Sequence, residues 1–270
     1  MSVKHYHHHY RFSYRTSLRR HFTLLILIVA TIVFISIVVI KSLFPESVFD
    51  VKQISIIDIV IATINTLIRL TIAYFAALII SVPLALGITK NQTLEKFLLP
   101  MFDILQSIPV LAFFPIIVVA FVKANFLEGA AIFIIIIAMI GSLVFSMIGG
   151  LKTIPEDITN SAKVYGATGF KRLWYVTLPS IFPYIVTGSL LAWSESWSII
   201  IVAEALHTYI PNGLPKDDLF GLGSLLVDSF SQGQNAVFIT SLSTLIIVIT
   251  LFNYFVWQKL LHVAERFRFD

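Results

Sequence analysis

The chain has 270 residues, of which 57% are hydrophobic and only 13% are charged, and its mean hydropathy is +0.90. A soluble domain carries about a quarter charged residues, so this composition lies well outside the soluble class. The sequence has no cysteine, which excludes disulfides and thiolate metal sites. The net charge of +4 comes from basic residues spread between apolar runs, a pattern that indicates membrane topology and no nucleic-acid partner.

The first 21 residues form a basic tail that begins with a histidine-rich segment containing HYHHHYRF. A histidine cluster of this kind can bind a metal ion. A basic and aromatic tail can also lie at the anionic surface of the cytoplasmic leaflet. We expect the second role, and we predict no metal site in the chain.

Six apolar segments approach the roughly 20 residues that a helix needs to cross a bilayer. The first is too long for a signal peptide and lacks a small-residue cleavage site, so we expect it to remain as a span. The pattern predicts an all-α polytopic membrane protein with about six transmembrane helices within residues 22–258 and a C-terminal segment at 259–270. The six segments are 23–40, 70–88, 104–121, 129–149, 181–203 and 236–257.

The basic residues predict an orientation, because Lys and Arg accumulate on the cytoplasmic side of a membrane protein. With the N-terminus inside, fourteen of them fall on the cytoplasmic side and four outside, with Arg69 at a helix edge. We therefore expect both termini to be cytoplasmic. The fourteen are Lys4, Arg11, Arg15, Arg19, Arg20, Lys90, Lys96, Lys152, Lys163, Lys171, Arg172, Lys259, Arg266 and Arg268.

The loop at about 152–178, cytoplasmic in this topology, contains the segment TIPEDITNSAKVYGATGF. Thr153 with Glu156 three residues later matches a capping box, and Pro155 in the first turn costs no hydrogen bond. Gly166 is placed to end the helix. The pattern predicts a short helix whose apolar face awaits a partner protein. That face consists of Ile158, Ala162 and Tyr165.

The same loop resembles the inner-membrane permeases of binding-protein-dependent ATP-binding-cassette (ABC) importers. Their motif is Glu-Ala-Ala, three residues, Gly, nine residues, Ile, one residue, Leu-Pro. Here the motif reads Asn160-Ser161-Ala162, then Gly166, then Val176, and finally Leu178-Pro179. The spacing matches at every position, whereas Asn160 and Ser161 replace the opening Glu and the first Ala.

Further segments support this resemblance from about residue 60 to 258. The segment TLIRLTIAYFAALIISVPLALGI is similar to the second helix of these permeases, and LLPMFDILQSIPVLAFFPIIVVAF to the next. The later segments IVAEAL and GLGSLL are similar to the subgroup that imports nitrate, sulfonates, taurine and related small solutes. The resemblance implies a type I ABC importer permease fold in a prokaryotic plasma membrane.

The resemblance also implies the partners. These are ABC ATPase subunits, an extracytoplasmic solute-binding protein, and a second permease that is either another copy or a related chain. The sequence contains no phosphate-binding loop, so we expect no cofactor in this chain, with ATP and Mg²⁺ bound by the ATPase. The residues implied in ATPase coupling are Ile158, Ser161, Ala162, Tyr165, Gly166, Ala167, Lys171 and Arg172. Lys171 and Arg172 either reinforce this contact or only anchor the loop at the lipid surface.

A translocation pathway is expected near polar residues within the spans. Glu195 is costly inside a membrane, so it either lines the pathway or has a structural role. In the structural role it pairs with Arg69, orients hydroxyl groups or is protonated. Trp193 and Trp197 lie one turn apart and either line the route or pack in the core. The candidate pathway residues are Pro109, Trp193, Ser194, Glu195 and Trp197.

The loop at about 205–234 is external in this topology, and a short helix is expected at about 222–230. Under the resemblance it lies at the mouth where the solute-binding protein docks, with Asp217 and Asp218 as candidate contacts. Glu204 either contacts that protein or caps local backbone.

Two other classes of protein fit the sequence less well. A secondary transporter or channel can have six helices, but neither needs a capped cytoplasmic helix at this spacing, and a coupled carrier is expected to hold more intramembrane ionisable groups. A membrane enzyme needs a nucleophile and base inside the spans, and the histidines lie outside the spans or at their ends.

Overall fold

The structure is a computed structural model that describes residues 55–210 and 218–267. Every regular element within these ranges is a helix, as expected of an all-α membrane protein. The basic tail (1–21) and the first expected span (23–40) lie outside the described residues.

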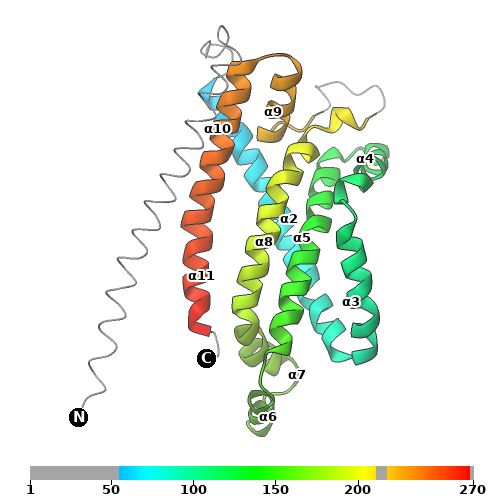
Figure 1. Cartoon of the computed structure of the whole chain (residues 1–270), viewed down its shortest axis with the longest axis vertical. Helices are drawn as coiled ribbons and strands as arrows, with labels where there is room; N and C mark the ends of the chain where they lie inside the picture. The colour runs from blue at the N-terminus through cyan, green and yellow to red at the C-terminus, as the bar shows by residue number, and fades with distance from the viewer. Residues whose placement is uncertain (1–54, 211–217, 268–270) are drawn as a thin grey trace, which may run out of the picture. The chain divides into compact units, whose positions relative to one another are not determined.

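Among the described residues, four helical segments are long and apolar enough to cross a membrane. They contain the expected segments 70–88, 129–149, 181–203 and 236–257. The last three segments run side by side in Figure 1, and the first crosses behind them. These four sequence predictions are therefore confirmed as membrane-length helices. The long segments are Ile56–Lys90, Leu127–Lys152, Gly169–Glu204 and Asn235–Phe267.

The first two segments are single helices, α2 (Ile56–Lys90) and α5 (Leu127–Lys152). Each of the other two contains one π-helical turn, a feature that is frequent at functional sites. The third segment consists of α7 (Gly169–Arg172), the π-turn η3 (Leu173–Thr177) and α8 (Leu178–Glu204). The fourth consists of α10 (Asn235–Phe252), the π-turn η6 (Asn253–Trp257), α11 (Gln258–Ala264) and η7 (Glu265–Phe267).

The expectation of one helix over 104–121 is wrong. Helix α3 (Gln92–Ser107) ends before Pro109, and a 3-10 turn η2 (Val110–Phe113) then leads into α4 (Phe114–Lys123). Proline lacks a backbone donor and disfavours helical geometry at the preceding residue, so a helix usually stops before it. Two short helices, which pack against α5, therefore replace the single span.

Helix α5 lies at the centre of the described bundle, because it packs against both α2 and α8. Its apolar residues recur around the whole helix, as expected for a helix surrounded by others. Its large buried side chains are Ile134, Ile135, Met139, Leu143 and Met147. The core of the bundle therefore fixes the positions of α2 and α8, which carry the polar groups described below.

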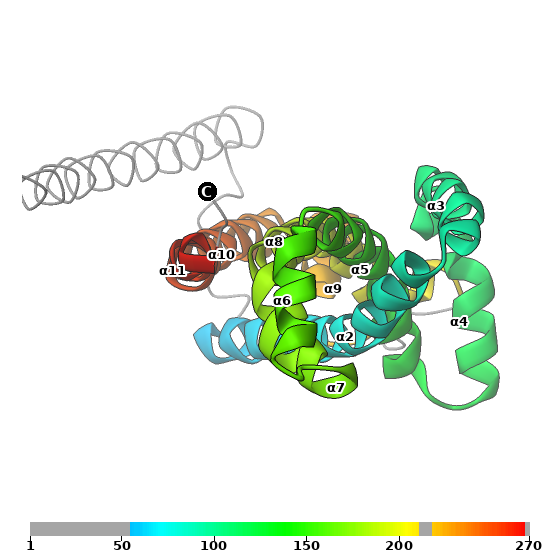
Figure 2. The same ribbon diagram turned by 90° about the horizontal axis from the view of Figure 1, so that it is seen from below.

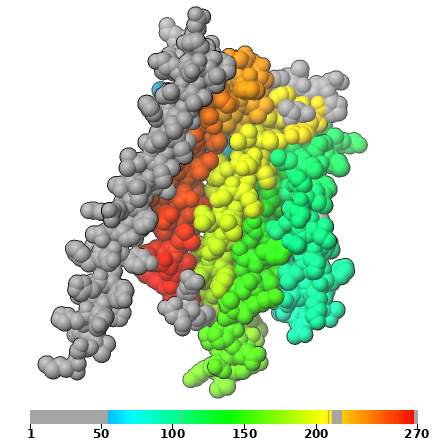
Figure 3. All heavy atoms as spheres, in the orientation of Figure 1, coloured from blue at the N-terminus to red at the C-terminus, as the bar shows by residue number. Residues whose placement is uncertain are grey.

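The bundle has two distinct ends. At the α6 end, α6 (Glu156–Val164) and α7 extend beyond the neighbouring helices, and both are nearest the viewer when the bundle is seen from that side (Figures 1 and 2). The space-filling view shows the same projection (Figure 3). At the opposite α9 end lie η4 (Leu206–Thr208) and α9 (Leu222–Ser231), which confirms the helix expected at 222–230.

Candidate functional site

The helix α6 ends as its sequence predicts. Gly166 has φ +73°, a left-handed conformation that glycine adopts readily. The Gly166 N–H donates to the Lys163 carbonyl at 3.0 Å, and the Ala167 N–H donates to the Ala162 carbonyl at 2.8 Å. This pair of bonds is a Schellman motif, so the glycine stops the helix and turns the chain back toward α7.

The start of α6 differs from the expected capping box. Helix α5 continues to Lys152, and the Thr153 hydroxyl donates backwards to the Gly150 carbonyl at 2.9 Å. Pro155 is the N-cap of α6, and no side chain caps the helix. The capping box is therefore wrong, because Thr153 closes the preceding helix and does not open the next one.

The expected apolar face of α6 is partly buried within the chain and partly exposed. Ala162 is buried and Ile158 is half-buried, on a helix that packs against η3, whereas Tyr165 is 88% exposed. The other residues implied in coupling lie nearby. Ser161, Gly166 and Lys171 are exposed, and Ala167 and Arg172 are half-buried.

Four further exposed apolar side chains extend this region and were missed from the sequence. Together with Tyr165 they form what we call the α6 surface. The aromatic-rich segment FKRLWYV, which contains two cations and lies outside the apolar runs, was a signal for three of them. They are Val164, which is 84% exposed, Phe170, Trp174 and Tyr175. Phe170 and Trp174 stack with ring centroids 6.3 Å apart. An exposed aromatic cluster of this kind marks an interaction site.

Trp193 and Trp197 are buried on α8. Trp193 stacks on Phe252 at a centroid distance of 4.5 Å and meets Tyr74 and Trp257 edge to face. Of the two roles considered, core packing describes Trp193 best. Both tryptophans also border a cavity of about 260 Å³ between α8 and α10–η6. Its other lining residues are Ser194, Ser198, Ile249, Phe252, Asn253 and Trp257.

Glu195 lies on the exposed side of α8 and accepts the Ser142 hydroxyl at 2.9 Å with each of its two oxygens. The pairing with Arg69 considered for it is wrong, because Arg69 binds two other carboxylates. Glu195 belongs to a polar stripe along one side of α8, whose residues are exposed in this single chain. The stripe on α8 consists of Thr187, Ser194, Glu195 and Ser198. Pro109 lies away from it, between α3 and η2.

Arg69 is the centre of a buried network at the α9 end, well inside α2 and not at a helix edge. Its guanidinium donates to both oxygens of Glu128 at 2.7 and 2.8 Å. It also donates to Glu204 at 2.8 Å and to the Phe220 carbonyl at 3.1 Å. Bidentate pairing of this kind is the strongest form of ion pair in proteins. The network joins α2, the start of α5, the end of α8 and the chain that leads into α9.

The Glu204 carboxylate is fully buried. It accepts the Thr66 hydroxyl at 2.8 Å and the Gly223 backbone N–H at 2.7 Å. Gly223 lies in the first turn of α9, where a negative charge is favourable. Contact of Glu204 with a docking protein does not fit this burial, whereas its alternative role, capping of local backbone, does. This network was not predicted from the sequence, although its three charges, Arg69, Glu128 and Glu204, each lie one residue beyond an expected span.

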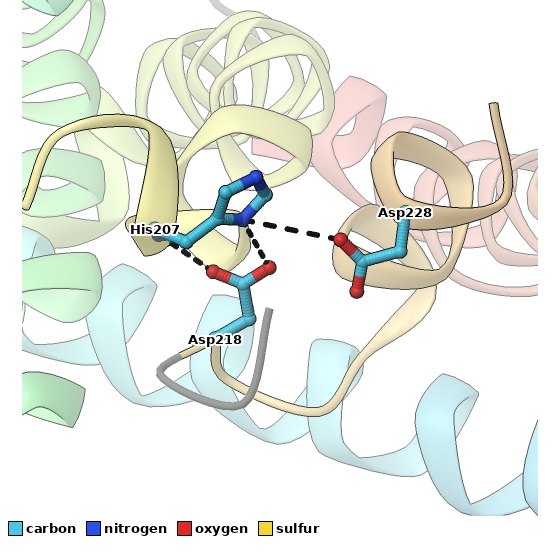
Figure 4. Close-up of side chains that lie close together, drawn as sticks. All are labelled: His207, Asp218 and Asp228. Atoms are coloured by element: carbon cyan, nitrogen blue, oxygen red, sulfur yellow. Dashed lines mark hydrogen bonds and ion pairs between the residues drawn. The ribbon is translucent and has the colours of Figure 1, made fainter. Parts of the chain in front are cut away.

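A second polar cluster lies at the α9 end, outside the long helices. Asp218 accepts the His207 backbone N–H and faces its Nδ1, both at 2.7 Å, and Asp228 Oδ1 lies 3.9 Å from the same Nδ1 (Figure 4). Burial, together with the charge of Asp218, raises the pKa of Asp228 from its ordinary value of 3.8 to about 6. The Asp218 side chain is largely enclosed, and Asp217 lies outside the described residues.

The chain is similar to known transport proteins. Residues 77–263 match the family described as "Binding-protein-dependent transport system inner membrane component". The bicarbonate transport system permease protein CmpB of Synechococcus elongatus is 34% identical over 170 residues, which are 63% of this chain and 57% of the relative. The nitrate import permease protein NrtB of Leptolyngbya laminosa is 30% identical over 168 residues, 62% of this chain and 56% of the relative.

A third relative is the taurine transport system permease protein TauC of Escherichia coli, 28% identical over 141 residues. That match covers 52% of this chain and 50% of the relative, so the chain spans a little over half the length of the curated relatives it matches. The family match covers more than half of the chain, includes the α6 motif, and agrees with the membrane-length helices. The chain is a multi-pass membrane protein and belongs to the family of binding-protein-dependent transport system inner membrane components.

Proposed function

We propose that this chain is the permease subunit of an ATP-driven importer, forming the solute pathway and docking on a separate ATPase through the α6 surface. The observation that carries the proposal is that surface itself. A helix closed by a Schellman motif projects beyond the bundle and presents exposed Val164 and Tyr165. Apolar groups exposed outside the membrane-length helices favour burial against a partner.

The docking contact has an apolar centre and a basic edge. Tyr165, Phe170 and Trp174 supply the large side chains that dominate interface energies, and the exposed Lys171 beside them supplies positive charge. Under this proposal the partner binds ATP and Mg²⁺ and hydrolyses the ATP. The permease contributes a rigid connection between the ATPase and its long helices, since α6 packs against η3 and η3 continues into α8.

The polar stripe on α8 is the best candidate for the pathway. A carboxylate facing lipid is costly, so groups such as Glu195 face a cavity or a partner. In a single chain the stripe is exposed, and pairing with a second permease, either another copy or a related chain, encloses it. Glu195 and Ser194 then line the route. The cavity beside Trp193 and Trp197 lies next to this stripe and shares Ser194 and Ser198 with it.

The orientation follows the basic residues, with the α6 end and both termini cytoplasmic and the α9 end external. The external solute-binding protein then docks at the α9 end, where the exposed Phe230 lies. For the solute we propose the class that the relatives' names share, a small polar solute such as bicarbonate, nitrate or taurine. The membrane under this proposal is a prokaryotic plasma membrane.

Co-purification with the ATPase encoded beside this gene tests the proposal. The variant Tyr165→Glu places a charge in the centre of the α6 surface without changing the core. The matched control is Phe230→Glu, because Phe230 is also an exposed aromatic residue but lies at the α9 end. We expect the parent and the control to retain the ATPase and Tyr165→Glu to lose most of it.

Two results would overturn the proposal. A parent protein that never retains the ATPase removes the coupling role and makes a secondary transporter or channel the leading alternative. Equal retention by Tyr165→Glu and the control, with both inserted in the membrane, shows that any ATPase contact lies elsewhere.

A further inference from the structure

The cluster at the α9 end brings three metal-ligating side chains together from separate parts of the chain. His207 lies in η4, Asp218 lies in the segment before α9, and Asp228 lies in α9 itself. One ligand atom from each lies within 4.8 Å of the others. The two carboxylates converge on the same imidazole nitrogen from different directions (Figure 4).

One buried oxygen of this cluster makes no hydrogen bond. Asp228 Oδ1 is buried and makes no hydrogen bond, and it lies 3.9 Å from His207 Nδ1. A buried acceptor that makes no hydrogen bond costs roughly 1–3 kcal/mol. Asp218 already binds the imidazole at 2.7 Å, so one nitrogen faces two carboxylates and can satisfy only one of them.

We propose that His207, Asp218 and Asp228 form a binding site for one divalent transition-metal ion, for which Zn²⁺ is the best fit. This site is independent of the proposed transport function.

The distances suit a tetrahedral ion. Zinc binds imidazole nitrogen and carboxylate oxygen at about 2.0–2.2 Å, which places the ligand atoms about 3.4 Å from one another. The two measured separations from Nδ1, 2.7 Å and 3.9 Å, lie on either side of that value. The hydrogen-bonded pair must open slightly and Asp228 must move closer. Both are side-chain adjustments that leave the backbone in place.

The ligand types select the metal class. An imidazole nitrogen disfavours Ca²⁺ and Mg²⁺, which take all-oxygen shells of six or more ligands, and favours zinc and its neighbours. A dication also balances the two carboxylates. Three protein ligands leave a fourth position for water, and the partial exposure of His207 and Asp228, 17% and 23% of their side chains, provides access.

A bound metal ion would connect the end of α8 to α9, in addition to the connection that the Arg69 network makes. His207 follows Glu204 by three residues, and Asp228 lies on the helix whose first turn Glu204 caps. The ion would therefore hold the α9 end in one conformation when zinc is present. Metal binding that occurs only in the folded state raises its stability by mass action.

The test measures zinc binding to the full chain, purified through a tag without histidine and stripped with a chelator. The N-terminal histidines 5, 7, 8 and 9 are replaced by Asn in every sample, since they are a second possible source of zinc binding. The variant Asp228→Asn keeps the side-chain volume and removes the carboxylate that makes no hydrogen bond through Oδ1. The matched control is His262→Asn, because His262 also lies beside a carboxylate, Glu265 at 3.3 Å.

We expect one zinc ion per chain in the parent and in the control, measured by elemental analysis and by competition with a chromophoric chelator. Asp228→Asn should weaken binding at least tenfold and abolish the rise in melting temperature on adding zinc. His207→Gln, which removes the only nitrogen ligand, should do the same if Asp228→Asn fails to insert. Zinc binding unchanged in both variants, or absent from the parent at micromolar zinc, would overturn the proposal and leave a hydrogen-bonded His–Asp pair.

Discussion

The two ends of the bundle use their side chains in opposite ways. At the α9 end, Arg69 and Glu204 are buried and bind each other, and the rest of the network satisfies them. At the α6 end, Val164 and Tyr165 are more than four-fifths exposed and contribute little to the core. The Arg69 network is therefore satisfied within this chain, whereas the α6 end presents a surface that a partner would complete.

This difference separates stability from coupling. Substitutions in the α9 network act on buried charges and on close backbone contacts, so they change the free energy of unfolding. Substitutions on the α6 surface act on groups that are already exposed, so they change partner binding and leave folding intact.

The largest effect is expected for Arg69→Met. It leaves the fully buried Glu204 carboxylate without its cation, and removal of one partner of a buried pair costs about 3–5 kcal/mol. Thermal unfolding in detergent measures the loss. The double variant Arg69→Met/Glu204→Gln should recover part of it, because no unpaired charge remains at position 204. A loss under about 1 kcal/mol in the single variant would contradict the account of the network.

A smaller effect is expected when Ala replaces a glycine at either end. At Gly223 an added Cβ lies 2.6 Å from the Ile201 Cα, so backbone must move and the cost is about 2–3 kcal/mol. At Gly166 the added Cβ meets nothing within 4 Å, and only the left-handed backbone costs about 1–2 kcal/mol. Melting temperatures of the two variants test this order. The reverse order would show that the α9 end is less tightly packed than described.

In metal-free protein, the pH dependence of the free energy of unfolding should reflect the titration of the Asp228 carboxyl group. Its pKa is raised in the folded state, so the folded state binds more protons between pH 3.8 and about 6. The contribution of Asp228 to the free energy of unfolding is therefore fully present below pH 3.8. It is lost as the pH rises through about 6, with a change of about 1–3 kcal/mol. Asp228→Asn should flatten this part of the pH profile. An identical profile in parent and variant would show that Asp228 is ordinarily solvated.

The smallest effect on stability is expected for Val164→Glu. The side chain is already 84% exposed, so the free energy of unfolding should change by less than about 0.5 kcal/mol. Under the proposed function the same variant loses the ATPase. A large fall in melting temperature would mean that Val164 packs within the chain, and the contrast between the two ends would fail.

Local patterns made much of the fold predictable. Uninterrupted apolar runs predicted the membrane-length helices because length and hydropathy decide that property. Gly166 predicted the end of α6 because few other residues adopt its backbone conformation. The segment 104–121 failed because hydropathy was given more weight than Pro109, which breaks the helix. The capping box failed because the Thr153 hydroxyl has two possible acceptors, and the sequence does not show how far α5 continues.

The site contacts that were not predicted join residues that are far apart in the sequence and close together only in the folded chain. Arg69 and Glu204 are 135 residues apart, and their pairing follows from the packing of α2 and α8 around α5. Pairing Arg69 with Glu195 was equally consistent with the sequence, since both acids lie near the same apolar run. Likewise, His207, Asp218 and Asp228 share no motif, and only the fold of the α9 end brings them together.

Cross-linking from single cysteines tests the central claim most directly, because the chain has no native cysteine. Tyr165→Cys and Phe230→Cys place one thiol at each end of the bundle. In membranes that hold the whole transporter, we predict that a photoactivatable reagent on residue 165 cross-links to the ATPase, whereas the same reagent on residue 230 does not. Cross-linking from residue 230 alone, or labelling of residue 165 from outside the cell, would contradict the assignment of the α6 end as the cytoplasmic coupling surface.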